Sequence, residues 1–217
     1  MGGDAREALA GVRDALDPAV QENPLVVAVR EGRAPLAAVA VFAAEENLII
    51  PSDRRSFLTL AARAGEPAAA GFFAGLAQGE NLVLPMVAPL AAAAGMDRAG
   101  LAAYEPRAGC QAYPAYVSWL ALNAEPAAAA LALVANFAAW GGYCAALATG
   151  LRQRYGFGDP ACAFLDFFAA PAPDLEEQAV TAAQAALDSG VPLDAARRYG
   201  RLLHEYETAF WGTLADI

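Results

Sequence analysis

The chain has 217 residues, 58% of them hydrophobic, and a formal net charge of −10, which argues against nucleic-acid binding because an acidic surface repels phosphate backbones. The three cysteines, Cys110, Cys144 and Cys162, contain no CxxC pair, which argues against a disulfide framework and a structural zinc site. We find no basic-then-apolar signal at the N-terminus and no apolar run of the ~18–20 residues that a membrane span needs. A cytoplasmic protein without a membrane partner is therefore expected.

Composition and periodicity predict a single all-α domain over residues 1–217. Alanine, the best helix former, dominates the apolar residues, and β-branched residues are sparse. Proline and glycine interrupt the chain at intervals that suit helices. About nine or ten helices with short connections are expected, which indicates a helical bundle. In chain order they span about 4–16, 18–30, 35–50, 52–64, 67–94 with a break near Gly79, 114–122, 126–155, 160–168, 174–189 and 193–217.

Prolines set several of these expected boundaries. Pro51 should end one helix, because it lacks an N–H and clashes with the preceding turn. Ser52 is then a suitable N-cap for the next helix, with Asp53 in its first turn. Residues 105–112 should form a loop, and Pro114 should open the helix that follows it. Two further prolines should kink the segment 67–94, namely Pro85 and Pro89.

Polar residues within apolar helices are candidate site residues. Glu45 and Glu46 interrupt a strongly apolar segment. Successive helical residues lie about 100° apart, so at least one of the pair should point near the buried face; the alternative is that both lie on a solvated edge. Asn136 stands in an otherwise apolar helix, where its amide either joins two helices by a hydrogen bond or lines a pocket.

The last predicted helix carries the remaining candidates. His204 is the only histidine, which excludes a His-rich metal site, so we expect no metal and no cofactor. Glu207, Phe210 and Trp211 are spaced i, i+3 and i+4 and therefore share one helix face. A carboxylate among aromatic rings could bind a planar, basic heterocycle, whereas the alternative is ordinary core packing.

Five segments agree in order and spacing with the motifs of a known family. They are Asn23-Pro24-Leu25 with Gly32, Pro35 and Phe42-Ala-Ala-Glu45-Glu46; Ala115-Tyr116-Val-Ser-Trp119-Leu; Ala132-Leu133-Val134-Ala135-Asn136-Phe137-Ala-Ala-Trp140; Phe164-Leu165-Asp-Phe-Phe168; and Tyr206-Glu207-Thr-Ala-Phe210-Trp211-Gly212. They resemble the TenA/thiaminase-II family, whose members have the haem-oxygenase-like fold. The resemblance covers nearly the whole chain and implies a haem-oxygenase-like helical bundle that forms a homo-oligomer, a dimer or a tetramer.

The resemblance also implies roles for individual residues. Glu207 falls at the family's proton-handling carboxylate, which makes it the candidate catalytic residue. Glu46 falls where the family has an Asp that holds the substrate. The other implied substrate-binding positions lie in the same motifs and are Tyr116, Asn136, Trp140, Phe168 and Phe210. The implied ligand is a small heterocycle, such as a thiamine-related aminopyrimidine.

One position departs from the family in a way that affects the chemistry. Asn136 falls at the nucleophilic Cys, and an amide cannot replace a thiolate. Cys144 lies two helical turns further on and cannot occupy the same point. Ile49 and Phe168 replace family tyrosines, which removes two hydroxyl groups.

Several functions remain open after this departure. The first is Cys-independent hydrolysis of aminopyrimidines, with Glu207 and Glu46 moving protons in an apolar pocket. The second is a non-catalytic binding or regulatory protein that keeps the cavity. The third, a PqqC-like or di-iron oxidase, is disfavoured because a di-iron site needs several histidine and carboxylate ligands.

Overall fold

The computed structural model describes residues 4–16 and 23–217, where helices are the only regular secondary structure. This confirms the all-α prediction, and the N-terminal part of the predicted helix 18–30 lies outside the described residues. The helices are α1 (Ala5–Arg13), α2 (Pro24–Arg30), α3 (Leu36–Arg63), α4 (Pro67–Ala93), α5 (Arg98–Ala102), α6 (Ala108–Asn123), α7 (Pro126–Tyr155), α8 (Asp159–Ala169), α9 (Pro173–Asp188) and α10 (Ala196–Ala215).

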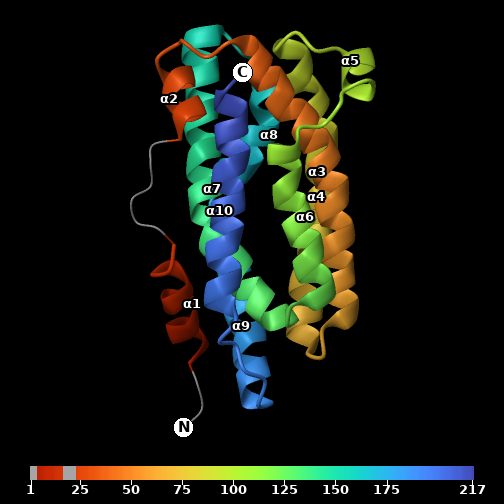
Figure 1. The fold of residues 1–217 in the computed structure, drawn as a ribbon, viewed down its shortest axis with the longest axis vertical. Helices are drawn as coiled ribbons and strands as arrows, with labels where there is room; N and C mark the ends of the chain where they lie inside the picture. Colours follow the sequence, from red (N-terminus) through yellow and green to blue (C-terminus); the bar gives the residue numbers. More distant parts are fainter. Residues whose placement is uncertain (1–3, 17–22) are drawn as a thin grey trace.

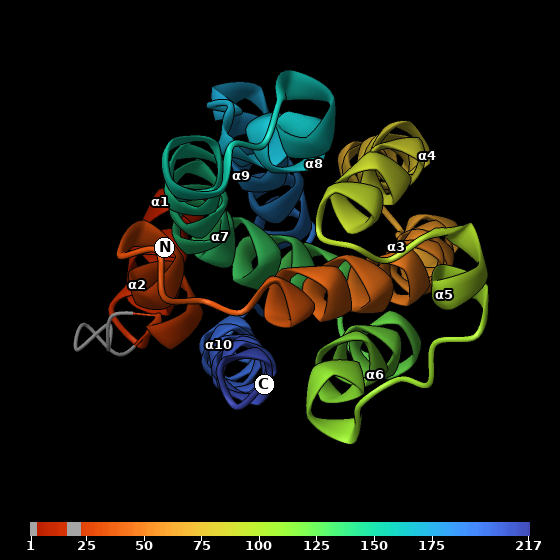
Figure 2. The ribbon, with the colours of Figure 1, turned by 90° about the horizontal axis from the view of Figure 1, so that it is seen from above.

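The long helices α3, α4, α6, α7 and α10 run along the long axis of the molecule and form its body (Figure 1). Seen from above, α3 lies between α4 and α6, and α10 lies beside α7 (Figure 2). The pairs α3–α4, α3–α6, α6–α10, α7–α10 and α7–α8 are all in contact. Helices α1 and α2 pack against α7 and α10 at the lower and upper ends of the bundle in Figure 1.

Three expected helix boundaries are wrong, two of them drawn from prolines and one from a glycine. Pro51 does not end a helix, because α3 continues through it from Leu36 to Arg63, so Ser52 is no N-cap. The chain from Pro67 to Ala93 is one helix, α4, with no break near Gly79. Pro114 lies inside α6, which begins already at Ala108. At Pro51 and Pro114 the packing of a buried helix face outweighs the lost backbone hydrogen bond.

The buried apolar side chains form two clusters, one toward each end of the bundle, and the same five helices supply residues to both. The first cluster takes Leu60 of α3, Phe73 of α4, Leu120 of α6, Leu131 of α7 and Leu203 of α10. The second takes residues from the opposite halves of these helices, namely Ile49, Val83, Cys110, Cys144 and Phe210. Each long helix therefore passes from one cluster to the other.

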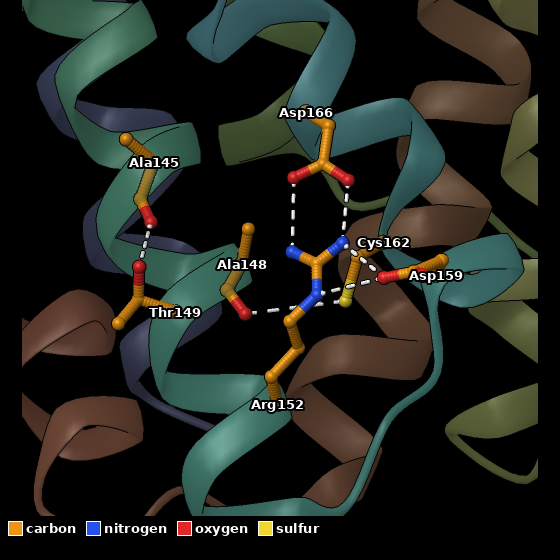
Figure 3. Close-up of polar contacts among 7 residues, drawn as sticks. All are labelled: Ala145, Ala148, Thr149, Arg152, Asp159, Cys162 and Asp166. Carbon is orange, nitrogen blue, oxygen red and sulfur yellow. Dashed lines mark hydrogen bonds and ion pairs between the residues drawn. The ribbon is translucent and has the colours of Figure 1, made fainter.

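Helix α7 is central to this arrangement. It is held to α8 by Arg152, which pairs with Asp166 at 2.6 Å and Asp159 at 3.0 Å (Figure 3). Glycine 156, at φ 72°, ends the helix in the left-handed conformation. Among the described helices, α7 alone is long and apolar enough to cross a membrane, a property that core helices share, and its residues 126–136 are all buried in the bundle.

Candidate functional site

Glu207 of α10 is buried and accepts hydrogen bonds from two donors, one on the next turn of α10 and one on α7. The indole Nε1–H of Trp211 donates to Glu207 Oε1 at 3.0 Å, and the Asn136 side-chain amide of α7 donates to Glu207 Oε2. Glu207 is 3% exposed and Asn136 is 4% exposed. The carboxylate and the amide, which lie 71 residues apart in the sequence, therefore meet inside the protein.

Aromatic rings from four helices form a cluster beside this pair. Trp140 of α7 packs against Phe168 of α8, with ring centroids 5.8 Å apart, and against Phe210 of α10, at 6.3 Å. The Trp211 ring, whose N–H binds Glu207, lies 5.4 Å from Trp140 and stacks at 5.6 Å on Phe42 of α3. The predicted residues Trp140, Asn136, Phe168, Glu207 and Phe210 are thus brought together.

The five long helices carry polar side chains at the level where each helix passes from one apolar cluster to the other. Each of these helices contributes one such residue between its two apolar stretches: Asp53 of α3, Glu80 of α4, Tyr113 of α6, Asn136 of α7 and Glu207 of α10. We call this set the polar layer. Tyr113 packs against both apolar clusters, as expected of a residue at their junction.

The acids of the polar layer have raised pKa values. Burial raises the pKa of Asp53 well above its usual range, and the charge of Glu80 adds to this effect. Burial also raises the pKa of Glu80 itself to about 8. The pKa of Glu207 is raised by burial, while the hydrogen bonds from Asn136 and Trp211 oppose that rise. The pKa of Tyr113 is raised by burial and by the neighbouring carboxylates.

Glu45 and Glu46 are both buried, with different surroundings. Glu45 accepts hydrogen bonds from the Tyr104 hydroxyl at 2.6 Å, the Arg107 backbone N–H at 2.7 Å and the Gln111 side-chain amide at 2.7 Å. It therefore anchors the start of α6. Glu46 instead has its pKa raised well above the usual range by burial and by four carboxylates, Asp53, Glu80, Glu45 and Glu207. The predicted site residue of the pair, Glu46, is thus the one that faces the acids.

Tyr116 lies in a different environment from the other predicted residues. Its ring packs against Tyr206 at 5.0 Å and stacks on Trp119 at 5.8 Å. Burial raises its pKa to about 12, and the charges that act on it belong to Tyr199, Tyr206, Arg198 and Arg201 rather than to the polar layer. Tyr113, one helical turn earlier, is the tyrosine that faces the acids.

Sequence reasoning missed Asp53, Glu80 and Tyr113. The expected helix break at Pro51 places Asp53 in the first turn of a new helix. A continuous helix places Asp53 seven residues after Glu46 and hence on nearly the same face. That spacing is the signal that would have identified Asp53.

None of the three cysteines is an activated thiol. Burial raises the pKa of Cys110 to about 12 and raises that of Cys162. Burial also raises the pKa of Cys144 well above its usual range, and the charges of Glu46 and Glu207 add to the effect. Because the thiolate is the nucleophilic form, these environments disfavour cysteine attack.

The side chains of the described residues do not form a metal-binding group. Within residues 4–16 and 23–217, no three or more His, Cys, Asp or Glu side chains are grouped so that they could hold a metal ion. His204 is half-buried and acts on Glu207 only as a nearby charge. A di-iron oxidase therefore lacks a ligand set in the described part of the chain.

Two surface cavities lie away from Glu207. One, of about 570 Å³, is lined by residues at the ends of α3, α4 and α5, including Ala40, Met96 and Asp97. The other, of about 220 Å³, lies between α3 and α6 beside Arg55 and Ser118. The predicted internal pocket at Glu207 and Asn136 stays a prediction.

Solved structures with the same fold include TenA proteins. A TenA family transcription regulator from Silicibacter sp. shares 16% identity at a TM-score of 0.70, with 100% of this chain and 98% of that chain covered. A TenA homologue from P. horikoshii shares 17% identity at a TM-score of 0.66, with 98% and 95% covered. A domain of unknown function with a heme oxygenase-like fold from Shewanella denitrificans shares 14% identity at a TM-score of 0.68, with 97% and 88% covered. These similarities confirm the haem-oxygenase-like fold.

Family comparison agrees with the fold. A search among curated protein sequences finds no match. The model of the TENA/THI-4/PQQC family matches residues 13–216, nearly the whole chain, and so confirms the predicted TenA resemblance. This protein therefore belongs to the TENA/THI-4/PQQC family.

Proposed function

We propose that this protein binds a small basic heterocycle of the aminopyrimidine class beside Glu207. The observation that carries the proposal is the buried Glu207 carboxylate, oriented by Asn136 and Trp211 at the edge of an aromatic cluster. Such a carboxylate can accept a hydrogen bond from a protonated ring nitrogen or from an exocyclic amine. Aromatic rings can stack on a planar heterocycle. Asn136 Oδ1 is buried without a hydrogen-bond partner and offers a further acceptor.

Binding is tested by thermal denaturation of the purified protein with thiamine and with a 4-aminopyrimidine. A ligand that binds only the folded state raises the melting temperature as its concentration rises. Glu207→Gln should abolish the shift, because it removes the charge while keeping the shape. The fold should tolerate this variant, since the unpartnered Asn136 Oδ1 can accept from the new amide after a flip of the Asn136 side chain.

The matched control is Glu205→Gln on the same helix, which changes an exposed carboxylate paired with Arg201. It should retain the full ligand-induced shift. An unchanged melting temperature of the native protein with both compounds would contradict the proposed ligand class.

A hydrolytic activity on the same ligand is the second proposal, favoured by the raised pKa values of Glu207 and Glu46. A carboxylic acid with a raised pKa can donate its proton to a leaving amine, while a second carboxylate accepts a proton from the attacking water. The route uses no cysteine. Product formation from thiamine or an aminopyrimidine, abolished in Glu207→Gln, supports an enzyme, whereas a thermal shift without product supports a binding or regulatory protein.

A further inference from the structure

The smaller of the two surface cavities, between α3 and α6, is lined mainly by hydroxyl groups. Its volume is about 220 Å³, and its polar lining residues are Ser52, Arg55, Ser56, Thr59 and Ser118. The first four are spaced i, i+3, i+4 and i+7, so the unbroken helix α3 presents them on one face. No residue of the polar layer lines this cavity, which is therefore distinct from the region beside Glu207.

Arg55 is the one charged side chain among the residues that line the cavity. It is exposed, and within the described part of the chain it forms no ion pair and no side-chain hydrogen bond. Asp53 does not neutralise it, because the charge that acts on that buried acid comes from Glu80. A guanidinium without a carboxylate partner favours an anion in the cavity.

The two helix segments beside the cavity carry no negative charge. Residues 54–63 of α3 and 108–123 of α6 contain no Asp or Glu, although the chain as a whole has a net charge of −10. Arg63, at the end of α3, donates a hydrogen bond to the Ala121 backbone carbonyl at 2.7 Å, which offsets the partial negative charge at the end of α6. This face of the bundle is therefore locally basic on an acidic protein.

Hydroxyl groups supply hydrogen-bond donors beside the Arg55 charge. Ser56 Oγ and Ser118 Oγ lie 3.1 Å apart, so one hydroxyl donates to the other, and the accepting one keeps its own proton for a further acceptor. Thr59 Oγ1 already donates to the Arg55 backbone carbonyl at 2.9 Å, whereas the Ser52 hydroxyl has no partner among the described residues. Three donors from two helices thus line one cavity: the guanidinium, the Ser52 hydroxyl and one hydroxyl of the serine pair.

This set of donors suits a phosphate group. The planar fork of a guanidinium binds two phosphate oxygens, and hydroxyl groups can donate to the others. A cavity of about 220 Å³ is smaller than the roughly 300–1,000 Å³ of pockets that enclose drug-sized ligands, so it suits one group of this size. The net charge of −10 opposes an extended polyanion such as nucleic acid, which leaves a small phosphate compound.

We propose that the cavity between α3 and α6 binds the phosphate group of a small compound, either free phosphate or a phosphate monoester. Arg55 supplies the charge and the forked donors, and Ser52 and the Ser56–Ser118 pair supply the remaining hydrogen bonds. Leu122, 68% exposed and part of the cavity lining, provides an apolar contact for the organic part of a monoester. This site is independent of the heterocycle site proposed beside Glu207.

Isothermal titration calorimetry at pH 7 and constant ionic strength tests the site on the full chain. The probes are inorganic phosphate, glycerol 3-phosphate and acetate. At least one of the two phosphate compounds should bind with a dissociation constant below about 1 mM. Acetate should bind at least about tenfold more weakly, because its single charge and two oxygens cannot engage all three donors.

Substitutions of Arg55 locate the binding. Arg55→Gln should weaken phosphate binding at least about tenfold, whereas Arg55→Lys, which keeps the charge and loses the fork, should have a smaller effect. The matched control is Arg98→Gln on α5, which replaces another exposed arginine without an ion pair among the described residues and should leave the dissociation constant unchanged. Because Arg55 is exposed and unpaired, its variants should fold as the native protein does, which urea denaturation checks.

The serine pair gives a second, sharper comparison. Ser118→Ala alone should change phosphate binding little, because Ser56 then keeps a proton that it can donate to the ligand. The double variant Ser56→Ala/Ser118→Ala removes both hydroxyls and should weaken binding about threefold or more. Equal binding by the double variant and the native protein would contradict the role of the pair.

The results decide whether the site exists and which compound occupies it. No phosphate binding up to about 10 mM, or equal binding by Arg55→Gln and the native protein, would overturn the proposal. Acetate that binds as tightly as phosphate would overturn the assignment to a phosphate group. Tighter binding of glycerol 3-phosphate than of inorganic phosphate would support a monoester as the ligand, and the opposite order would support free phosphate. No probe is a heterocycle, so these results leave the proposal for Glu207 to its own test.

Discussion

At the scale of single residues, three buried carboxylates on two helices perform different tasks because their surroundings differ. Glu45 accepts three hydrogen bonds and holds the start of α6. Glu207 accepts two and presents its charge to an aromatic cluster. Glu46 lies among other acids and has a raised pKa. Neighbouring donors, rather than residue type, thus distinguish a structural acid from a candidate site acid.

Removal of the Glu45 carboxylate should destabilise the fold. Glu45→Ala removes the shared acceptor of three partly buried hydrogen bonds, so we expect the free energy of unfolding to fall by about 2–4 kcal/mol. Tyr104→Phe removes one of these bonds and should cost about 1 kcal/mol. Urea denaturation measures both. Glu31→Ala, at an exposed pair with Arg33, should change stability by no more than about 0.5 kcal/mol.

Stability should also decrease as pH rises, because of the acids in the polar layer. The pKa of Glu80 rises on folding from 4.5 to about 8, so between these values the folded chain holds a proton that the unfolded chain has released. Raising the pH therefore favours unfolding, by about 1 kcal/mol per pH unit for each such group. Asp53 and Glu46 shift in the same direction.

Urea denaturation at pH 5, 6, 7 and 8 measures this dependence. Glu80→Gln should flatten the slope and raise stability most at pH 8, whereas Glu205→Gln should leave the slope unchanged. A native protein whose stability rises steadily from pH 5 to pH 8 would contradict the raised pKa values.

At the scale of elements, continuous helices place the site residues. Because α3 continues through Pro51, Glu46 and Asp53 lie on nearly one face of the same helix. Because α7 runs unbroken from Pro126 to Tyr155, Asn136 and Trp140 stand one turn apart above α10. A helix break at Pro51 would have directed Asp53 elsewhere.

Close packing of α7 against α2 gives a prediction for this helix. A Cβ at Gly150 would lie 2.8 Å from Val29 Cγ1 and 3.3 Å from the Val29 backbone, so Gly150→Ala should destabilise the fold by about 1–3 kcal/mol. Gly142, on the same helix, has nothing within 4 Å of such a Cβ. Gly142→Ala should therefore stabilise the protein by about 0.5–1 kcal/mol through helix propensity. Equal effects of the two substitutions in urea denaturation would contradict this packing.

At the scale of the whole molecule, the five long helices have the same arrangement of side chains. Each helix contributes to an apolar cluster toward each end of the bundle and carries a polar side chain between the two clusters. Burial of this polar layer raises the pKa values of Asp53, Glu80 and Glu207 together, because these acids share one region of low dielectric. The layer therefore acts as one electrostatic unit. Confinement of this protein to the cytoplasm and its organisation as a single domain stay predictions.

The predicted homo-oligomer is tested in solution. A dimer or a tetramer should give two or four times the chain mass of 22.4 kDa in light scattering or analytical ultracentrifugation. Exposed apolar side chains such as Trp119 and Leu122, at 46% and 68% exposure, are surfaces that an oligomer could cover. A monomer mass across the micromolar concentration range would contradict the prediction.

The sequence by itself determined the local features. Alanine-rich, amphipathic segments make helices wherever they pack, and the i, i+3, i+4 spacing places Glu207, Phe210 and Trp211 on one face in any helix. The order of motifs was enough to identify the family, which the match over residues 13–216 confirms. These properties depend on residues close together in the chain.

Only the tertiary structure decided which distant residues meet. Asp53, Glu80 and Tyr113 join Asn136 and Glu207 because five helices pack in one register, and no short-range pattern encodes that register. Packing also decided that Pro51 and Pro114 stay inside helices, because burial of a long apolar face outweighs one lost backbone hydrogen bond.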